Sequence, residues 1–232
     1  MTTRGQAIYE DAMPPAESAR KTAAIPEAKP QRWQQRKAAM TREVILDAAT
    51  DCLVEDGYAA LTTVEVINRA GVSRGAMHHH FANRSELLAA LIDHVLHKRL
   101  ERFLSEYLST IEDSDPARAI EVATDVHWHS VQTPEYAAYL ELLMAARTDA
   151  ELQAILVPAT NAFEREWMSE MEKALPQWMG APKEMLLAND LAASLHLGLL
   201  INRPYFADKE RRRAVRDKLV DLVKEVYRTA KP

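Results

Sequence analysis

The stretch TTVEVINRAGVSRGAMHHHF, residues 62–81, contains two short helical segments separated by a turn. Thr62 starts a capping box with the glutamate three residues later, which marks the start of the first helix. Gly71 ends that helix, and Ser73 is placed to cap a second helix over 74–80. Two short helices joined by a turn that contains glycine predict a helix-turn-helix.

The second short helix ends in three consecutive histidines, His78, His79 and His80. Adjacent helical residues point in different directions, so the three imidazoles cannot share one metal ion. Met77 and Phe81 lie one turn apart and form the apolar side that packs onto the protein. The histidines therefore fan over the exposed side of the helix.

This exposed side combines small residues with hydrogen-bond donors. Gly75 and Ala76 are small enough to allow close approach, and Arg74 and the three imidazoles surround them. All four polar side chains can donate hydrogen bonds to phosphates or base edges. A short helix with such a face fits the major groove of DNA.

Helical patterning continues along the chain, and no segment shows the alternation of a strand. Capping and proline signals mark the starts of several helices, and the apolar period marks their lengths. The sequence therefore predicts an all-α fold of about nine helices. The further helices are expected over 41–57 with Thr41 as N-cap, from Asn83 to about 111, after Asp115-Pro116, after Thr133-Pro134, over 149–175 with a kink or restart at Pro158, over 182–201 and over 208–229.

Composition divides the chain into three parts. Residues 1–37 lack a sustained apolar period and end in the basic stretch KPQRWQQRK, residues 29–37. We predict a disordered or partly ordered extension over 1–37, the helix-turn-helix domain over 38–88, and a larger helical domain over 89–232. The basic stretch is either a solvated lead-in to the first helix or an arm that contacts DNA.

Charge and cysteine content limit the function classes. The net charge is −5, and residues 41–88 hold four basic and seven acidic residues, so contact with nucleic acid must be local. The single cysteine, Cys52, lies on the apolar side of a predicted helix, so we expect a buried thiol in the core. No long apolar run predicts a membrane span, and no leader is evident, so we expect a cytoplasmic protein.

Residues 41–95 resemble the DNA-binding domain of the tetracycline-repressor (TetR) family of bacterial regulators. The resemblance rests on VILDAATDCLVEDGYAALT and on TTVEVINRAGVSRGAMHHHFANRSELLAALIDH, which follows it. It implies a homodimer that binds double-stranded operator DNA and a small-molecule effector. The implied DNA-contacting residues are Thr63, Ser73, Arg74, Gly75, Ala76, His78, His79, His80 and Arg84, with Arg84 holding a phosphate at the start of the long helix.

The second domain is rich in aromatic residues and methionines, which form either a core or the walls of a cavity. The resemblance places these helices around an effector site, so we expect a small apolar or aromatic ligand there. The candidate residues are Phe103, Tyr107, His127, Trp128, Tyr139, Met144, Arg147, Phe163 and Trp167.

The last two helices carry apolar stripes at helical spacing. The stripes either pack within the chain or, as the resemblance implies, form a four-helix dimer interface with a second copy. The candidate interface residues are Leu191, Leu195, Leu199, Leu219, Leu222 and Val226.

Two other function classes compete with a ligand-controlled repressor. A metal-dependent enzyme could use His94 and His97, which lie one turn apart beside Asp93, but no catalytic motif accompanies them. A DNA-binding protein without ligand control would not need the large second domain. The sequence indicates a regulator and not an enzyme, with no cofactor and no metal ion.

Overall fold

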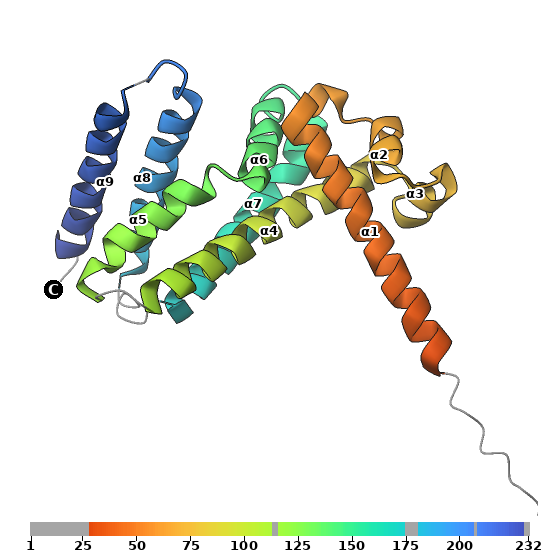
Figure 1. Ribbon diagram of the computed structural model, residues 1–232, viewed down its shortest axis with the longest axis horizontal. Helices are drawn as coiled ribbons and strands as arrows, with labels where there is room; N and C mark the ends of the chain where they lie inside the picture. Colours follow the sequence, from red (N-terminus) through yellow and green to blue (C-terminus); the bar gives the residue numbers. More distant parts are fainter. Residues whose placement is uncertain (1–27, 113–115, 175–180, 207, 230–232) are drawn as a thin grey trace, which may run out of the picture. The chain divides into compact units, whose positions relative to one another are not determined.

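The computed structural model describes residues 28–112, 116–174, 181–206 and 208–229 (Figure 1). Within these ranges the chain forms nine α-helices and two short 3-10 helices, and no strand, as the sequence predicts. The chain divides between Ala38 and Ala39 into two compact units. The disorder predicted for the first 27 residues falls outside the described residues.

The first helix, α1 (Ala28–Asp56), begins earlier than the sequence predicted. Thr41 lies inside this helix, so its assignment as N-cap is wrong, and the basic stretch 29–37 is helical. The reason is that the segment before Thr41 consists mainly of Ala, Gln, Arg and Lys, which are strong helix formers. The proline within it lies in the first turn, where proline is tolerated.

The helix-turn-helix follows α1 as predicted. After the 3-10 turn η1 (Tyr58–Ala60) come α2 (Thr63–Ala70) and α3 (Arg74–His80). The remaining elements are α4 (Arg84–Glu112), η2 (Pro116–Arg118), α5 (Ala119–Ser130), α6 (Pro134–Ala145), α7 (Ala150–Ala174), α8 (Pro182–Ile201) and α9 (Lys209–Thr229). α7 runs through Pro158 as one helix, so no second helix start is found there.

The largest apolar cluster joins the helix-turn-helix to the second domain. It contains Met77 of α3 and Phe81, which directly follows α3; they are 1% and 3% exposed and so are buried as the sequence predicted. Cys52 of α1 is also fully buried in this cluster. The same cluster includes Leu142 of α6 and Leu152 of α7, so α3 and the second domain share one core.

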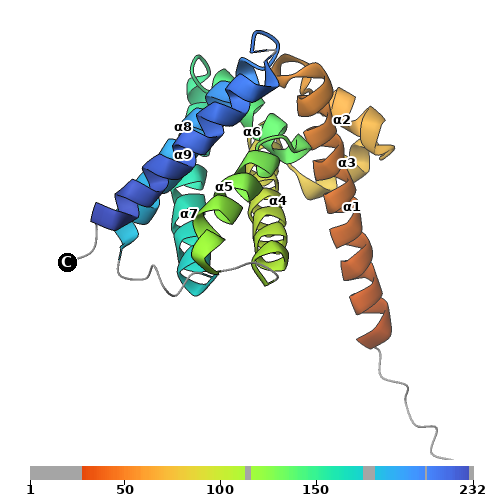
Figure 2. The ribbon, with the colours of Figure 1, turned by 60° about the vertical axis from the view of Figure 1, so that its left-hand side comes forward.

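α4 contributes to two apolar clusters along its length. Its first half, from Leu87 to Leu96, belongs to the cluster shared with α3, α6 and α7. Its second half places Phe103 and Tyr107 in a second cluster with residues of α5, α7 and α8. α4 lies against α5, α6 and α7, and α8 and α9 lie side by side (Figures 1 and 2).

α8 is long and apolar enough to cross a membrane by length and composition alone. The sequence analysis expected no such stretch. In the structure α8 packs along α9 and α5 and buries Met185, Ala188 and His196, while 28% of its apolar window is buried. A single helix of this kind is weak evidence for a membrane span.

The buried ring of Phe81 gives a test of this shared core. Phe81→Ala should lower the free energy of unfolding by about 3–5 kcal/mol, because it leaves a cavity where α3, α1 and α4 meet. Urea denaturation followed by circular dichroism measures the change. Val64→Ala is the control: that side chain is 54% exposed, and its truncation should cost less than about 0.5 kcal/mol. Equal losses in the two variants would contradict the assignment of Phe81 to the core.

Candidate functional site

The starts of α2 and α3 are capped by the local hydrogen bonds that the sequence predicted. The hydroxyl of Thr62 accepts a hydrogen bond from the backbone N–H of Glu65 at 3.1 Å. Gly71 adopts the left-handed conformation, with φ of +63°, which favours glycine. The hydroxyl of Ser73 accepts from the N–H of Ala76 at 3.1 Å. These caps fix where α2 ends and where α3 begins.

α3 presents a polar face on the side opposite its buried residues. Arg74, Gly75, His78 and His79 are exposed. Ala76 and His80 are half-buried, and the rings of His79 and His80 meet edge to face, with centroids 5.3 Å apart. The structure therefore brings an arginine, two imidazoles and a glycine together on one accessible surface, which we call the α3 face.

His80 has a different environment from the other two histidines. Burial lowers the pKa of His80, and the nearby His79 and Arg42 lower it further. Arg42 of α1 lies over the ring of Phe81, with 5.3 Å between the guanidinium carbon and the ring centroid. His80 therefore sits against the protein and is disfavoured as a cation.

Ion pairs within the protein occupy most of the acidic residues of α1 and α2. Arg69 of α2 pairs with Glu65 at 2.8 Å, with Glu55 at 2.6 Å and with Asp56. Lys98 of α4 pairs with Asp47 at 3.3 Å, and Glu43 lies 3.8 Å from the same ammonium group. The negative charge of this region is thus partly compensated within the chain.

The structure places Arg84 differently from the free phosphate-binding side chain expected from the sequence. Its guanidinium donates a hydrogen bond to the carbonyl of Leu61 at 2.6 Å and lies over the ring of Tyr58 at 5.5 Å. The hydroxyl of Tyr58 in turn donates to Asp149, just before α7, at 2.9 Å. Arg84 therefore links the start of α4 to the segment before α2. The cause is tertiary, because Leu61 and Tyr58 are distant from Arg84 in the sequence.

The start of α4 is closed by a capping box. Asn83 accepts a hydrogen bond from the N–H of Glu86 at 2.9 Å, and the carboxylate of Glu86 accepts from the N–H of Ala82 at 2.9 Å. The capping pair predicted at Asn83 and Glu86 is thereby confirmed. Asn83 thus satisfies one of the first backbone donors of α4, and Glu86 satisfies a donor just before the helix.

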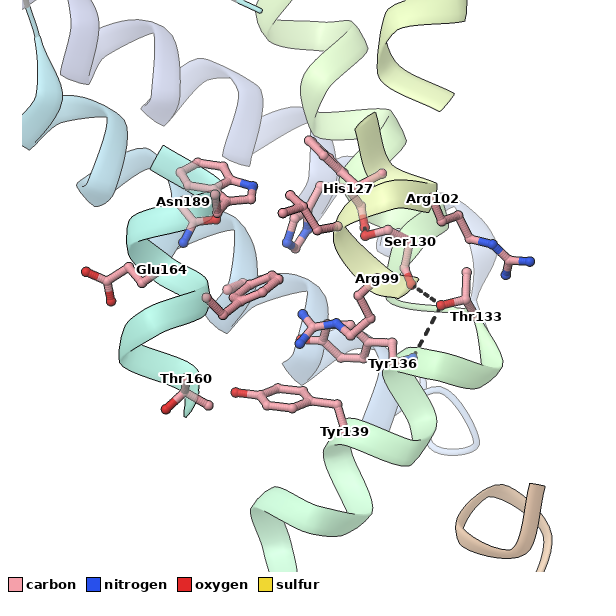
Figure 3. A pocket seen from close by; sticks show the side chains of 15 residues that line it. Arg99, Arg102, His127, Ser130, Thr133, Tyr136, Tyr139, Thr160, Glu164 and Asn189 are labelled. Carbon is pink, nitrogen blue, oxygen red and sulfur yellow. Dashed lines mark hydrogen bonds between the residues drawn. The ribbon is translucent and has the colours of Figure 1, made fainter. Parts of the chain in front are cut away.

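A cavity of about 210 Å³ lies between α4, α5, α6, α7 and α8 (Figure 3). Five of the residues proposed from the sequence for an effector site line it, on four different helices. They are Phe103, His127, Tyr139, Phe163 and Trp167. The structure thus brings together side chains that lie far apart in the sequence.

Four other residues proposed for this site do not line this cavity. Tyr107 is fully buried and stacks on Phe103, with ring centroids 6.0 Å apart. Trp128 faces α9, where Arg216 lies over its ring at 5.2 Å. Met144 is 49% exposed, and Arg147 is exposed. The apolar composition of the helices did not reveal which side of each helix faces the cavity.

Arg99 of α4, the most unusual residue of the cavity, was not among the residues predicted from the sequence. Its guanidinium lies over three rings, at 4.2 Å from the centroid of Tyr139, 4.6 Å from Tyr136 and 5.3 Å from Phe163. A signal was present in the sequence. Arg99 lies four residues before Phe103, so it interrupts the apolar stripe of α4 with a positive charge.

A second missed feature is a buried histidine pair beside the cavity. Nδ1 of His127 and Nδ1 of His196 lie 2.8 Å apart, so one donates a hydrogen bond to the other. Burial lowers the pKa of His127 to about 4, with a further contribution from Arg99. Burial also lowers the pKa of His196 to about 3, helped by His127 and Arg216. Both imidazoles are therefore neutral near pH 7.

Comparison with known proteins identifies the family. Residues 45–91 match the model of the bacterial regulatory proteins of the tetR family. An uncharacterised HTH-type transcriptional regulator of Mycobacterium tuberculosis is 31% identical over 155 residues, which are 66% of this chain and 76% of that protein. The chain belongs to the TetR family.

The similarity extends beyond the DNA-binding domain. The HTH-type transcriptional regulator CymR of Pseudomonas putida is 27% identical over 203 residues, which cover 84% of this chain and 95% of that protein. A structure of a SmeT–triclosan complex shares the fold, with a TM-score of 0.54 and 24% identity over 79% of this chain and 91% of that chain.

As a TetR-family member, the chain is a transcriptional regulator and not an enzyme. The histidines that could have served a metal enzyme have other partners here. Nε2 of His94 lies 2.9 Å from Asp47, and Nε2 of His97 lies 3.2 Å from Glu101. Among the residues that the structure describes, no three His, Cys, Asp or Glu side chains are grouped as metal ligands would be.

The apolar stripes of this TetR-family chain are divided between its own core and its surface. Leu199 and Leu219 are 5% and 0% exposed, so they pack within the chain and offer no surface to a partner. Leu191, Leu195 and Val226 are half-buried. Leu222 is 47% exposed. Leu187 is 50% exposed and was not among the interface residues predicted from the sequence. The list of interface residues drawn from the sequence therefore needs this correction.

The buried histidine pair predicts a loss of stability in acid. The unfolded chain binds protons at these histidines below pH ~6.5, whereas the folded chain does so only near pH 4 for His127 and near pH 3 for His196. The unfolded state therefore binds more protons in this window, and stability falls as the pH falls through it. Each histidine contributes up to about 1.4 kcal/mol per pH unit.

Urea denaturation between pH 7 and pH 4 tests this slope. The double variant His127→Gln, His196→Gln should show a smaller loss of stability across the window. His97→Gln is the control, because the side chain of His97 is 61% exposed, and it should keep the slope of the unmodified protein. The same slope in all three proteins would show that the pair is not buried in its neutral form.

Proposed function

We propose that this TetR-family regulator is a homodimeric repressor, bound to a palindromic operator and released by a small apolar or aromatic molecule. Two features carry the proposal together: the α3 face and the ring-lined cavity. They share one helix, α4, which packs against α3 and also lines the cavity. Its partners are double-stranded DNA, a second copy of the chain and the effector, and it acts in the cytoplasm.

The α3 face supports DNA recognition in the major groove. Arg74 and His79 are exposed and can donate hydrogen bonds to base edges, and Gly75 allows close approach of the helix backbone. His78 is placed for bases or phosphates, and Thr63 and Ser73 at the starts of α2 and α3 for phosphates. His80 and Ala76 are half-buried and contribute less surface.

A homodimer gives the recognition helix its second half-site. Two α3 helices related by a two-fold axis bind half-sites about one helical turn apart, or somewhat more, on a palindromic duplex. The exposed leucines of α8 and α9, Leu187 and Leu222, are the apolar surface available for that contact. The half-buried Leu191, Leu195 and Val226 extend it.

The route from ligand to DNA runs through packed side chains. A ligand in the cavity contacts Phe103 of α4, and the first half of α4 shares one core with Met77 of α3 and with Phe81. A ligand that shifts a two-state dimer from 1:99 to 99:1 must prefer one state by about 5.5 kcal/mol. The SmeT protein holds triclosan in its complex, and a ligand of that apolar class fits the rings of this cavity.

Substitutions on the α3 face test DNA recognition. In a duplex selected from random sequence by the purified protein, we expect an inverted repeat. Arg74→Ala and His79→Ala should each weaken binding to it by roughly 5- to 150-fold, since a specific base contact contributes about 1–3 kcal/mol. Fluorescence anisotropy measures the affinity, and thermal melting shows that the fold is kept.

The matched control for this prediction is Arg213→Ala, an exposed arginine on α9. It should retain affinity within about twofold. If Arg74→Ala and His79→Ala both bind the selected duplex as tightly as the control, α3 is not the reading helix.

A substitution on α9 tests the dimer. Leu222→Arg should give a monomer in analytical ultracentrifugation, because it places a charge in an apolar contact. The monomer should lose operator binding, because one half-site supplies too few contacts. Leu108→Arg on α4 is the control: Leu108 is 44% exposed and belongs to neither α8 nor α9, so this variant should remain a dimer. A dimer in both variants places the interface elsewhere.

A further inference from the structure

We infer that the cavity takes a small anionic ligand, a ring-bearing carboxylate, whose carboxylate is held by Arg99 and His127. This inference rests on the proposed function, because it names the chemical class of the effector for the same cavity. The starting observation is a cation at the cavity wall, Arg99, with which no acidic side chain among the described residues forms an ion pair.

Arg99 is an arginine without an acidic partner. None of the carboxylates in the described part of the chain forms an ion pair with it, and its neighbours are the rings of Tyr136, Tyr139 and Phe163. Burial lowers the pKa of Arg99, and the two tyrosines oppose that effect. An arginine side chain nevertheless stays protonated in proteins, so the cavity holds a positive charge. A charge in such a site costs free energy unless a counter-ion meets it.

Arg102 shows by contrast how unusual Arg99 is. Arg102 also lies at the cavity, but its guanidinium turns away and pairs with Glu135 at 3.0 Å (Figure 3). Glu164 contributes a carboxylate to the lining, and Figure 3 shows that carboxylate pointing away from Arg99. Neither side chain therefore neutralises Arg99, and an incoming carboxylate could.

The rings around Arg99 make a cationic ligand unfavourable. Three aromatic faces could bind a ligand cation, but the guanidinium of Arg99 already occupies them at 4.2 to 5.3 Å. A second cation would meet the charge of Arg99 at close range. The stacked position also holds the guanidinium plane in place, and a fixed guanidinium can give two parallel hydrogen bonds to a carboxylate.

His127 supplies a second hydrogen-bond donor, because the position of its proton follows from that of His196. Nε2 of His196 is buried without a hydrogen-bond partner. A buried N–H without a partner is rarer than a buried acceptor without one, so the proton of His196 belongs on Nδ1, from which it is donated to His127. His127 then accepts at Nδ1 and carries its own proton on Nε2. Because His127 lines the cavity, that N–H is available to an anionic ligand.

The size of the cavity limits the rest of the ligand. Its volume of about 210 Å³ is below the about 300–1,000 Å³ that is usual for drug-sized ligands, so one or two rings fill it. Phe103, Phe163 and Trp167 provide apolar walls for those rings. A single ring with one carboxylate can contact both the donors of Arg99 and His127 and the apolar walls.

Matched pairs of compounds test the inference. Benzoate and 2-naphthoate carry a carboxylate, and benzamide and 2-naphthamide have the same rings without the charge. Isothermal titration calorimetry measures binding to the full-length dimer, and anisotropy of a labelled duplex selected by the protein measures DNA release. We expect the carboxylates to bind at least about tenfold more tightly than the amides, since a charge-assisted hydrogen bond contributes about 1.5–3 kcal/mol.

Variants connect the preference to Arg99. Arg99→Gln should remove the preference for carboxylates while amide binding stays nearly unchanged, and Arg99→Lys should keep part of it. Arg102→Gln is the matched control, because its guanidinium is already paired, and it should keep the full preference. Thermal melts and binding to the selected duplex show whether each variant is folded.

The outcomes separate this inference from the proposed function. Amides that bind and release DNA as well as the carboxylates, or a preference that survives Arg99→Gln, would overturn the inference and leave ligand control in place. Carboxylate binding that depends on Arg99 but leaves DNA affinity unchanged would support the site and overturn ligand control. Absence of binding by every compound would overturn the inference.

Discussion

The apolar stripe of α4 is the constraint on which the rest of this structure depends. Between Leu87 and Leu96 it closes the core of the helix-turn-helix, and the same core takes in residues of α6 and α7. Farther along, Phe103 and Tyr107 close a second core with α5, α7 and α8. One helix therefore contributes side chains both to the core that holds α3 and to the core beside the cavity.

The DNA-binding region shows how an acidic protein can present a surface suited to DNA. Arg69 gathers three carboxylates at the junction of α1 and α2, and Lys98 and His94 meet Asp47 on α1. The exposed hydrogen-bond donors of α3 are therefore the polar groups that this surface offers to DNA. Arg84 belongs to the same internal framework, since its guanidinium is bound to the carbonyl of Leu61. The proposed contact with DNA therefore rests on a few side chains of α3 and not on overall charge.

The cavity contains the strongest departure from the rule that charges stay at the surface. Arg99 lies in the apolar stripe of α4, and rings take the place of an acidic partner. Beside it, His127 and His196 share one hydrogen bond and are held neutral by burial. Departures of this kind collect at functional sites, where a ligand completes an arrangement that the protein leaves incomplete.

The sequence by itself determined the all-α fold, the caps of α2, α3 and α4, and the side of α3 that is buried, because these depend on periodicity and on hydrogen bonds between near neighbours. Five of the residues that it suggested for an effector site line the cavity. Only the tertiary structure decided that Arg84 binds a backbone carbonyl, that Leu199 and Leu219 are core residues, and that Arg99 meets three rings. These features join residues far apart in the chain. A helical pattern shows which residues share one side of a helix, but not which other helix that side packs against.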